Sequence, residues 1–415
     1  MRNGGFLWII IAVAILIDFY VFQALKTVSQ GASSRARLIL FCCYWGLSVL
    51  SLILFASLPY LFSHPGSKLR NYLFATLLGL FIAKLLASVF FLVDDIRRLI
   101  QWAATSLFTH PAEAEQTGEG STISRSLFMS WLGLGLGGTL FSTLIYGFSN
   151  KYNYKLHRLK LAFNNLPPAF KGLKIIQLSD IHSGSFNNKR AVEKGVEMVL
   201  KEKPDLILFT GDLVNDKASE MHDYTDVFSR LKAPMGVFST LGNHDYGDYV
   251  WWESAEAKKA NLERLKQLQA DMGWRLLMNE HVVLERGGQE IALLGIENWS
   301  AKARFPKYGR MSEAYAGTEK YPFKILMSHD PSHWDAEVRT RYPDIDLALA
   351  GHTHGMQFGI EIPGIKWSPV QYVYKEWAGL YEEGRQKLYV NRGYGFLGYP
   401  GRVGIMPEIT VIELT

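Results

Sequence analysis

Four long apolar runs occupy the first 150 residues of this 415-residue chain. They cover residues 6–25, 38–62, 72–93 and 127–148. Each has the roughly 20 residues that a helix needs to cross the hydrocarbon core of a bilayer. Short flanks and nearly uninterrupted runs disfavour four buried helices of a soluble core, and a cleaved signal peptide would not precede three further spans. The pattern predicts a four-helix membrane region over residues 1–150, followed by a second domain over 151–415.

The polar segment between the third and fourth runs, residues 94–125, includes THPAEAEQTGEGS and has no periodic pattern. It is typical of a flexible or partly interfacial loop, with residues 96–108 as a candidate short helix on the membrane surface. Basic residues do not decide the orientation of the chain, because six lie in one set of loops and seven in the opposite set. The side of the membrane that the second domain faces therefore stays open.

Two ionisable residues lie inside the predicted spans, Asp18 in the first and Lys84 in the third. Such residues either pair or mark a functional path, or they lie close enough to an interface to reach water. In the fourth span Gly133 and Gly137 form a GxxxG pattern, which allows two helices to approach closely.

After residue 173, short β-like runs alternate with segments of helical period. Residues 174–178 and 206–209 are strand-like, and the apolar positions of 192–200 share one helix face, with Asn187 or Asn188 as a candidate N-cap. After residue 282, six strand-like runs follow without long helices between them. This order predicts an α/β domain, with a second sheet packed on the first and helices on the flanks.

Composition excludes little. The net charge of +5 is mild and no basic patch or motif is evident, so we expect no nucleic-acid partner. The same charge is compatible with a basic surface near anionic lipid. Cys42 and Cys43 are adjacent and lie within an apolar run. Neighbouring cysteines rarely bridge each other, so no disulfide is expected.

Five short fragments of the second domain carry the candidate chemistry, each directly after a β-like run. They are Asp180-Ile181-His182, Gly211-Asp212, Gly242-Asn243-His244-Asp245, Ser328-His329-Asp330 and Gly351-His352-Thr353-His354. Strand-end loops are where α/β proteins place their chemistry. Carboxylate, amide and imidazole groups without thiolates suit Mn²⁺, Fe²⁺/³⁺ or Zn²⁺, and their number is too large for one ion. The fragments predict two divalent ions about 3.5–4 Å apart that share a bridging carboxylate.

The order D-x-H, G-D, G-N-H-D, H, G-H-T-H resembles that of the calcineurin-like metallophosphoesterases over about residues 157–415. Within that family, the motifs LKIIQLSDIHSG, STLGNHD and GHTHG are most similar to those of the bacterial membrane-linked branch. The resemblance implies a β-sandwich flanked by helices and a dinuclear centre with seven metal ligands. These are Asp180, His182 and His354 for the first ion, Asp212 as the bridge, and Asn243, His329 and His352 for the second ion. It also implies that His244 protonates the leaving oxygen and that Asp245 orients the His244 imidazole.

Several further residues concern the substrate. Met356 stands where that branch usually has a second glycine, and Ser183 where a bulkier residue is common. Arg392 and Arg402 are candidates to clamp a phosphate oxygen, because guanidinium matches phosphate bidentately; for Arg402 a surface position is as good an interpretation. The aromatic cluster after His244, residues 246–252, either lines the substrate entrance, touches the membrane interface or simply packs under a loop.

The leading prediction is a membrane-anchored phosphoesterase that depends on two divalent ions and hydrolyses a phosphodiester or pyrophosphate by a metal-bridging hydroxide. A multi-pass anchor in a bacterial cell membrane suggests a lipid-linked substrate, and no protein partner is inferred. The alternatives are a tethered phosphomonoesterase or nucleotidase for soluble substrates, and a catalytically silent scaffold. A binding module has no need of seven metal ligands and a free acid, which argues against the silent scaffold.

Overall fold

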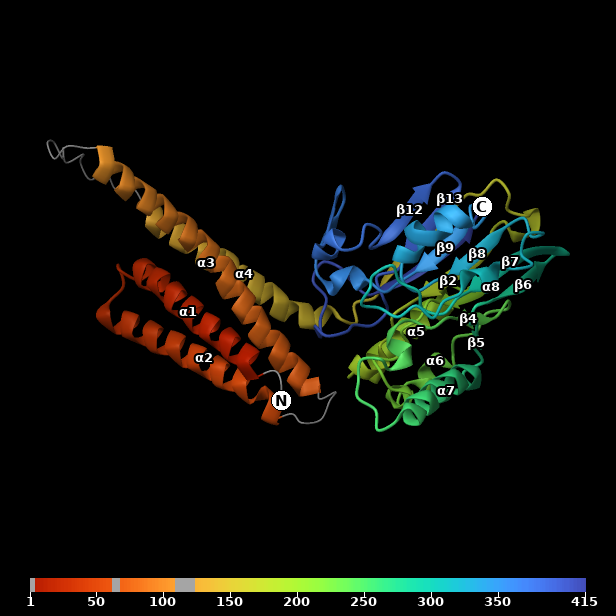
Figure 1. Cartoon of the computed structure of the whole chain (residues 1–415), viewed down its shortest axis with the longest axis horizontal. Helices are drawn as coiled ribbons and strands as arrows, with labels where there is room; N and C mark the ends of the chain where they lie inside the picture. Colours follow the sequence, from red (N-terminus) through yellow and green to blue (C-terminus); the bar gives the residue numbers. More distant parts are fainter. Residues whose placement is uncertain (1–3, 62–67, 109–123) are drawn as a thin grey trace. The chain divides into compact units, whose positions relative to one another are not determined.

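The computed structural model describes residues 4–61, 68–108 and 124–415. The chain divides into two compact units, Met1–Tyr146 and Gly147–Thr415, each described here by itself. The segment THPAEAEQTGEGS of the predicted loop lies outside the described residues. Figure 1 traces the order of the elements along the chain.

Four helices correspond to the four apolar runs, and each is long and apolar enough to cross a membrane. They are α1 (Gly4–Val28), α2 (Ser34–Leu61), α3 (Lys68–Phe108) and α4 (Arg125–Asn150). The separate surface helix predicted for 96–108 is wrong, because these residues continue α3 without a break. The stretch 94–108 contains neither glycine nor proline, and Arg97 bonds back to Asp94 across one turn, so nothing ends the helix there.

Polar and small residues hold the first unit together. Lys84 Nζ of α3 lies 2.5 Å from Asp18 Oδ1 of α1 and 3.0 Å from Ser48 Oγ of α2. The two ionisable residues therefore pair with each other. A Cβ atom at Gly137 of α4 would lie 2.7 Å from the Ala83 carbonyl oxygen of α3, and one at Gly133 would lie 2.6 Å from the Phe91 ring. The GxxxG positions are thus where α4 approaches α3.

The second unit contains two six-stranded sheets. The first has the order β1-β14-β2-β3-β4-β5 and the second the order β12-β13-β9-β8-β7-β6. The strands of the first sheet are β1 (Lys155–Leu161), β2 (Lys174–Leu178), β3 (Leu206–Phe209), β4 (Val237–Ser239), β5 (Arg275–Leu276) and β14 (Glu408–Leu414). Those of the second are β6 (Glu280–Arg286), β7 (Gln289–Gly295), β8 (Lys324–Met327), β9 (Leu347–Ala350), β12 (Gly379–Glu383) and β13 (Gln386–Val390). A separate two-stranded hairpin is formed by β10 (Ile360–Ile362) and β11 (Ile365–Trp367).

Alternation along the strands divides the core into three apolar layers. Ile175 of β2 packs between the sheets with Leu293 of β7 and Ile325 of β8. Its neighbour Ile176 faces the other way, toward the helices α5 (Lys189–Lys201), α6 (Thr225–Phe228) and α7 (Ala255–Asp271). The far side of the second sheet is covered by α8 (Met311–Tyr315) and by the π-helical turn Trp334–Val338, which runs into α9 (Arg339–Arg341). The resulting order of layers, helices on sheet on sheet on helices, is the predicted sandwich (Figure 1).

One strand lies in a different sheet from the one predicted. The C-terminal run 408–414 was expected in the second sheet, but β14 inserts into the first, parallel to β1 and antiparallel to β2. The two sheets are therefore linked by the last strand of the chain as well as by the segment between β5 and β6.

Candidate metal centre

All five motif fragments lie at the carboxyl ends of parallel strands. Asp180 and His182 follow β2, Asp212 follows β3, and Asn243 and His244 follow β4 in the first sheet. His329 follows β8, and His352 and His354 follow β9, in the second sheet. Packing of the two sheets face to face brings both sets of loops to one edge of the sandwich. The structure thus gathers residues that are up to 174 positions apart in the chain.

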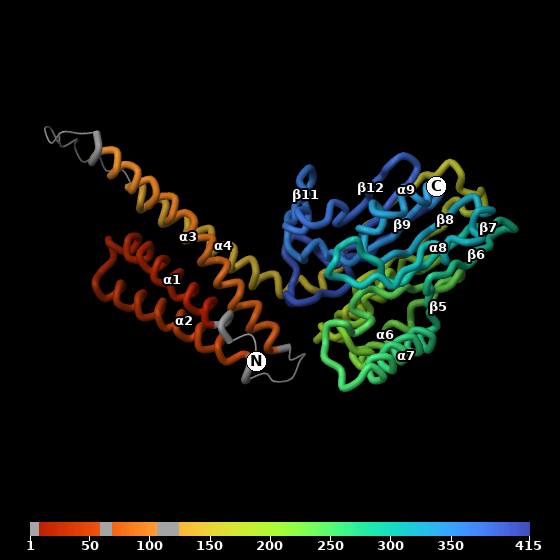
Figure 2. The backbone as a smooth tube through the Cα atoms, viewed as in Figure 1, coloured from red at the N-terminus to blue at the C-terminus, as the bar shows by residue number. Residues whose placement is uncertain are grey.

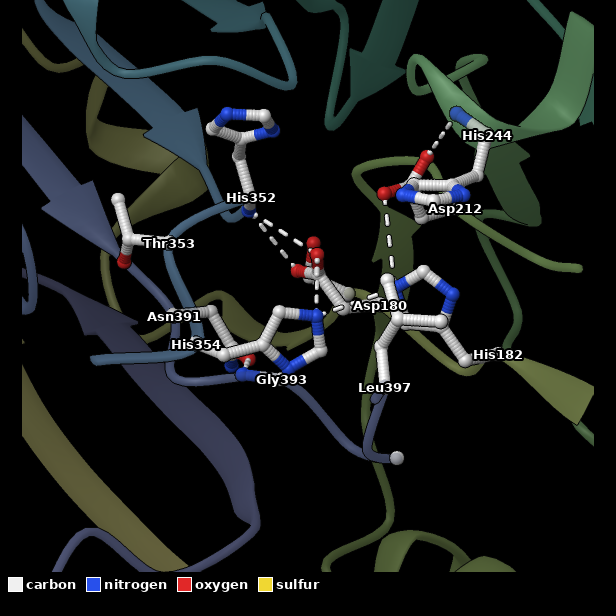
Figure 3. A network of polar contacts seen from close by, with 12 residues as sticks. Asp180, His182, Asp212, His244, His352, Thr353, His354, Asn391, Gly393 and Leu397 are labelled. Atoms are coloured by element: carbon white, nitrogen blue, oxygen red, sulfur yellow. Dashed lines mark hydrogen bonds and ion pairs between the residues drawn. The ribbon is translucent and has the colours of Figure 1, made fainter. Parts of the chain in front are cut away.

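Asp180, His182 and His354 form a first group that could hold a metal ion. His354 Nε2 lies 3.2 Å from Asp180 Oδ1 and 3.0 Å from His182 Nε2 (Figure 3). All three side chains are buried. Two ring nitrogens that face each other at this distance repel unless a proton or a cation lies between them.

Asp212, His329 and His352 form a second such group. His329 Nε2 lies 3.1 Å from Asp212 Oδ2 and 3.3 Å from His352 Nδ1. The amide oxygen of Asn243 lies 2.8 Å from the same His352 nitrogen. The structure therefore brings all seven predicted ligand residues together.

Asp212 lies between the two groups. Its Oδ2 atom is 3.6 Å from His182 Nε2 of the first group as well as 3.1 Å from His329 of the second. Its Oδ1 atom accepts the backbone N–H of His244 at 2.9 Å (Figure 3). This is the position that a bridging carboxylate occupies.

The loops reach this arrangement through unusual backbone conformations. Asp180, His182, Asp212, His352 and His354 all have φ between 48° and 70°, a region that non-glycine residues rarely adopt. At Gly351, a Cβ atom would lie 2.2 Å from an Asp180 carboxylate oxygen, so only glycine fits there. Backbone strain of this kind, clustered at one place, is typical of functional sites.

For His329 and His352, a hydrogen bond at one ring nitrogen determines which nitrogen faces the metal-ligand group. His329 Nδ1 lies 2.7 Å from the Thr210 carbonyl oxygen, which accepts its proton and leaves Nε2 facing Asp212. His352 Nε2 lies 2.9 Å from the Tyr374 hydroxyl, which in turn donates to Asp330 at 3.1 Å. We therefore place the His352 proton on Nε2, with the Nδ1 lone pair facing Asn243 and His329.

The electrostatics keep the carboxylates charged. Burial alone would raise the pKa of Asp180 and Asp212, but the neighbouring histidines hold both below the usual range. Burial lowers the pKa of His182. Burial also opposes protonation of His329, yet the Asp212 carboxylate raises its pKa to about 10, so a metal ion that binds Nε2 would displace a proton from it. Two ionised carboxylates among buried imidazoles form a donor set that fits divalent cations of the Mn²⁺, Fe²⁺ or Zn²⁺ type.

His244 is oriented by a different group from the one predicted. Asp245 makes its contacts to backbone, where its carboxylate accepts the N–H groups of Gly242, Asp212 and Leu213 at 2.8–2.9 Å. The His244 ring instead places Nδ1 2.7 Å from the Asn215 carbonyl oxygen. Asp245 therefore shapes the loops, and Asn215 turns the imidazole. The proximity of Asn215 to Asp212 in GDLVND was the available signal in the sequence.

The two arginines proposed as phosphate clamps are engaged elsewhere. Arg392 is buried, with Nη1 2.6 Å from Glu408 and Nε 2.9 Å from Glu361. Arg402 is fully buried and donates to the carbonyl oxygens of Arg392, Gly393 and His354 at 2.7–3.3 Å. The phosphate-clamp role is thus wrong for Arg392, because two carboxylates occupy its guanidinium. Arg402 is an interior residue that holds the 392–395 loop against His354.

A cavity of about 370 Å³ opens over the metal-ligand groups. His182, Asp212, Asn243, His244, His352 and His354 form its floor, and its walls include Arg304, Phe305, Met356, Val373 and Tyr374. None of these wall residues was assigned a role from the sequence except Met356. Of the aromatic cluster, Tyr249 bonds to Asn243 at 2.9 Å and Trp251 is exposed, whereas Tyr246 is buried.

Two family models match the chain. One, described as "Probable Calcineurin-like phosphoesterase, transmembrane domain", matches residues 1–151, and the other, "Calcineurin-like phosphoesterase", matches residues 173–356. The chain belongs to the calcineurin-like metallophosphoesterases. The metallophosphoesterase is therefore a hydrolase with a membrane domain, as its sequence predicts.

Several curated relatives match 60–63% of this chain. The metallophosphoesterase is 31% identical over 257 residues to "Uncharacterized metallophosphoesterase YkuE" of Bacillus subtilis, covering 60% of this chain and 81% of the relative. It is 30% identical over 265 residues to "Phosphodiesterase YaeI" of Escherichia coli, covering 62% and 86%. A zebrafish (Danio rerio) "Transmembrane protein with metallophosphoesterase domain" is 30% identical over 267 residues, covering 63% of this chain and only 57% of the relative's own length.

Proposed function

We propose that the protein is a multi-pass enzyme of a bacterial cell membrane that hydrolyses a phosphodiester or pyrophosphate with two divalent ions. The membrane region would comprise residues 1–150 and the catalytic domain residues 151–415. The observation that carries the proposal is the position of the Asp212 carboxylate between two buried groups of metal-ligating side chains. One ion would be held by Asp180, His182 and His354, and the other by Asn243, His329 and His352, with Asp212 between them.

The donor set determines what the protein supplies. When bound, two such ions lower the pKa of an attacking water and offset charge that develops on the phosphate oxygens. Asp180 and Asp212 contribute two negative charges and the other ligands are neutral, so the filled site keeps a net positive charge toward an anionic substrate. The strained loops hold these ligands in place before the substrate arrives.

His244 is the proposed general acid. With its Nδ1 proton donated to the Asn215 carbonyl oxygen, Nε2 is the nitrogen left to carry a proton to the leaving oxygen. The residue lines the cavity but belongs to neither metal-ligand group. The centre of its ring lies 5.0 Å from that of His182, one of the residues that would hold the first ion.

Arg304 takes the substrate role first considered for Arg392. Its exposed guanidinium lies 4.6 Å from the centre of the Phe305 ring, on the wall of the cavity. Stacking leaves the N–H edges of the group available to phosphate oxygens. Loss of one charge-assisted hydrogen bond, worth about 1.5–3 kcal/mol, predicts that Arg304→Ala lowers kcat/KM about 10- to 100-fold. Metal content should stay unchanged, and Lys307→Ala on the same loop is the control.

The membrane region supports a lipid-linked substrate. Only residues 151–154 separate the end of α4 from β1, so the catalytic domain is tied to the bilayer by a very short link. Hydrolysis of soluble monoesters or nucleotides does not require an enzyme held at the bilayer. The tethered phosphomonoesterase is therefore the second candidate.

The test uses the full chain in detergent, with Mn²⁺, on bis-p-nitrophenyl phosphate and p-nitrophenyl phosphate. We expect diester hydrolysis that His244→Ala lowers by about 10²- to 10⁴-fold with metal content retained. Asp212→Asn should lose both activity and metal, measured by elemental analysis, and His222→Ala should change neither. Hydrolysis of the monoester alone would favour the phosphomonoesterase. A folded, metal-loaded protein without turnover of either compound would contradict the proposal.

A further inference from the structure

The hairpin β10–β11 pairs with neither large sheet and projects from the second unit (Figure 2). Its two strands are antiparallel, with Ile360 opposite Trp367, Glu361 opposite Lys366 and Ile362 opposite Ile365. Residues directly opposite each other point to the same face of a hairpin. One face therefore carries three isoleucines and a tryptophan, and the other carries the charged pair.

The charged face is the one that contacts the rest of the domain. Glu361 accepts the Arg392 Nε–H at 2.9 Å, and Lys366 Nζ donates to the Ala378 carbonyl oxygen. The isoleucines point outward and are 48%, 56% and 53% exposed at positions 360, 362 and 365. A hairpin in water packs its apolar face on the core and exposes its polar face. Here the arrangement is reversed.

The apolar surface extends from the hairpin to the cavity. The Trp367 indole N–H lies 3.4 Å from the Tyr372 hydroxyl at the end of the 3₁₀ turn Pro369–Tyr372. Tyr372 is 77% exposed, and its neighbour Val373 is exposed and lines the cavity, as does Met356. Ten large apolar side chains of residues 147–415 are exposed, and six of them lie between residues 356 and 373. Exposed apolar residues scattered singly need no explanation, but a cluster of this kind marks a contact surface.

We propose that this surface, Met356, Ile360, Ile362, Ile365, Tyr372 and Val373, inserts into the interfacial layer of the lipid bilayer. The occupant is the bilayer, since four residues of chain connect the domain to a candidate membrane span. Branched aliphatic side chains at the tip with Trp367 and Tyr372 behind them match the composition of segments that lie in the headgroup region. The charged pair anchors the hairpin on the domain, so insertion exposes no buried ion.

Insertion would place the mouth of the cavity against the headgroup layer. Because Met356 and Val373 belong to both the apolar surface and the cavity wall, a phosphodiester in a lipid headgroup could reach the metal-ligand groups without its acyl chains crossing water. This consequence rests on the proposed function, whereas contact of the hairpin with the bilayer does not.

A lipid-quenching experiment on the full chain tests the contact without any need for catalysis. Cys42 and Cys43 are replaced by serine, a single cysteine is introduced by Ile362→Cys, and it is labelled with nitrobenzoxadiazole. The labelled protein is reconstituted in phosphatidylcholine–phosphatidylglycerol vesicles that carry acyl-chain nitroxides. The matched control is Val283→Cys, because Val283 is an exposed aliphatic residue on the β6–β7 hairpin.

We expect nitroxide quenching at position 362 to be at least about three times that at position 283, together with a blue shift of the emission. Equal quenching at the two positions would overturn the proposal. A blue shift without lipid quenching would also overturn it, because the surface would then be covered by protein, such as a second copy of the chain.

The substrate consequence has its own readout. In the double variant Ile362→Ser/Ile365→Ser, hydrolysis of a vesicle-borne phosphodiester lipid should fall at least about tenfold. Hydrolysis of bis-p-nitrophenyl phosphate by the same vesicles should be retained, which shows that the fold and the metal centre are intact. Lipid quenching at 362 with no effect of the double variant would leave the membrane contact standing and would overturn only its link to the substrate.

Discussion

Tyr374 orients the imidazole of His352, and the motifs did not identify it. Its hydroxyl accepts the His352 Nε2 proton at 2.9 Å and donates to Asp330 at 3.1 Å. Burial and the Asp330 carboxylate raise the pKa of Tyr374, so the hydroxyl stays protonated across the working range of pH. Removal of the hydroxyl frees the imidazole to turn and to exchange its tautomer.

We therefore predict that Tyr374→Phe weakens metal binding about 10- to 100-fold, measured by competition with a chelating dye. The matched control is Tyr372→Phe, since Tyr372 is exposed and two residues away. Equal affinities of the two variants would remove Tyr374 from the metal centre.

The sequence identifies the proposed ligands but not the groups that orient them. Asp180, Asp212 and His352 each follow a β-like run, so their common location could be predicted from the fragments alone. The Asn215 contact is made by a backbone oxygen, which imposes no residue type, so only the closeness of Asn215 to Asp212 in the chain pointed to it. Tyr374 acts through its side-chain hydroxyl but lies 22 residues after His352, outside every motif fragment. Arg392 illustrates the opposite error, since an arginine near a phosphate site is indistinguishable in sequence from one that is neutralised by buried carboxylates.

At the scale of elements, local patterns predicted most strands and helices but assigned β14 to the wrong sheet. β2 has the predicted bounds, and α5 begins after Asn188, whose side chain accepts the Ala191 N–H at 3.1 Å. The place of β14 in the first sheet depends on contacts with residues more than 230 positions earlier, which periodicity does not encode. The hairpin β10–β11 escaped notice because its apolar face points outward and its strands have only three residues each.

Glu408, at the start of β14, connects three strands and the loop that carries Arg392. Its carboxylate accepts from Arg392 at 2.6 Å, Tyr389 of β13 at 2.5 Å and Thr410 at 2.6 Å. Through Arg392 it also reaches Glu361 of β10. Replacement by glutamine keeps the shape but leaves the Arg392 charge only partly compensated, so Glu408→Gln should destabilise the domain by roughly 3 kcal/mol or more.

The effect of Glu408 should depend on pH. Burial alone would raise the pKa of Glu408, but Arg392 and His157 lower it to about 2. A carboxyl whose pKa is lower in the folded state stabilises the fold above its ordinary pKa, and that contribution is lost as the pH falls toward 2. The Tm difference between the wild type and Glu408→Gln, followed by tryptophan fluorescence, should therefore shrink between pH 6 and pH 3. Glu413→Gln, on the same strand, should show a small difference at every pH.

The contact between α3 and α4 offers a sharp comparison of two adjacent glycines. A Cβ atom at Gly137 would lie 2.7 Å from the Ala83 carbonyl oxygen, whereas one at Gly138 meets no described atom within 4 Å. Gly137→Ala should therefore destabilise the membrane unit by about 1–3 kcal/mol through overpacking. Gly138→Ala should be neutral or stabilising by up to about 1 kcal/mol, because alanine favours the helix. Equal thermal stability of the two variants in detergent would show that α3 and α4 do not pack at Gly137.

At the scale of the whole molecule, the protein has a membrane unit and a catalytic unit. The membrane unit contains an ion pair in its interior, and the catalytic unit has its site at one edge of the sheets. The Lys84–Asp18 pair connects three helices of the first unit. Lys84 of α3 also bonds to Ser48 of α2 at 3.0 Å. The Tyr44 hydroxyl of α2 donates to the Asp18 carbonyl oxygen of α1 at 2.8 Å. Charges in this setting are costly unless they are paired.

Breaking the pair should therefore cost more than exchanging it. Lys84→Asp leaves two carboxylates together, and removal of one partner from a buried pair typically costs about 3–5 kcal/mol. We predict a fall in Tm of roughly 5–15 °C for the full chain in detergent, by the usual relation between stability and Tm for a unit of this size. The exchanged variant Asp18→Lys/Lys84→Asp should recover more than half of that loss, although the lysine then extends from α1 and loses its bond to Ser48. If each single variant is destabilised and the exchanged variant recovers nothing, the two residues act separately. Their charges would then belong to a path for ions or protons and not to the assembly of the helices.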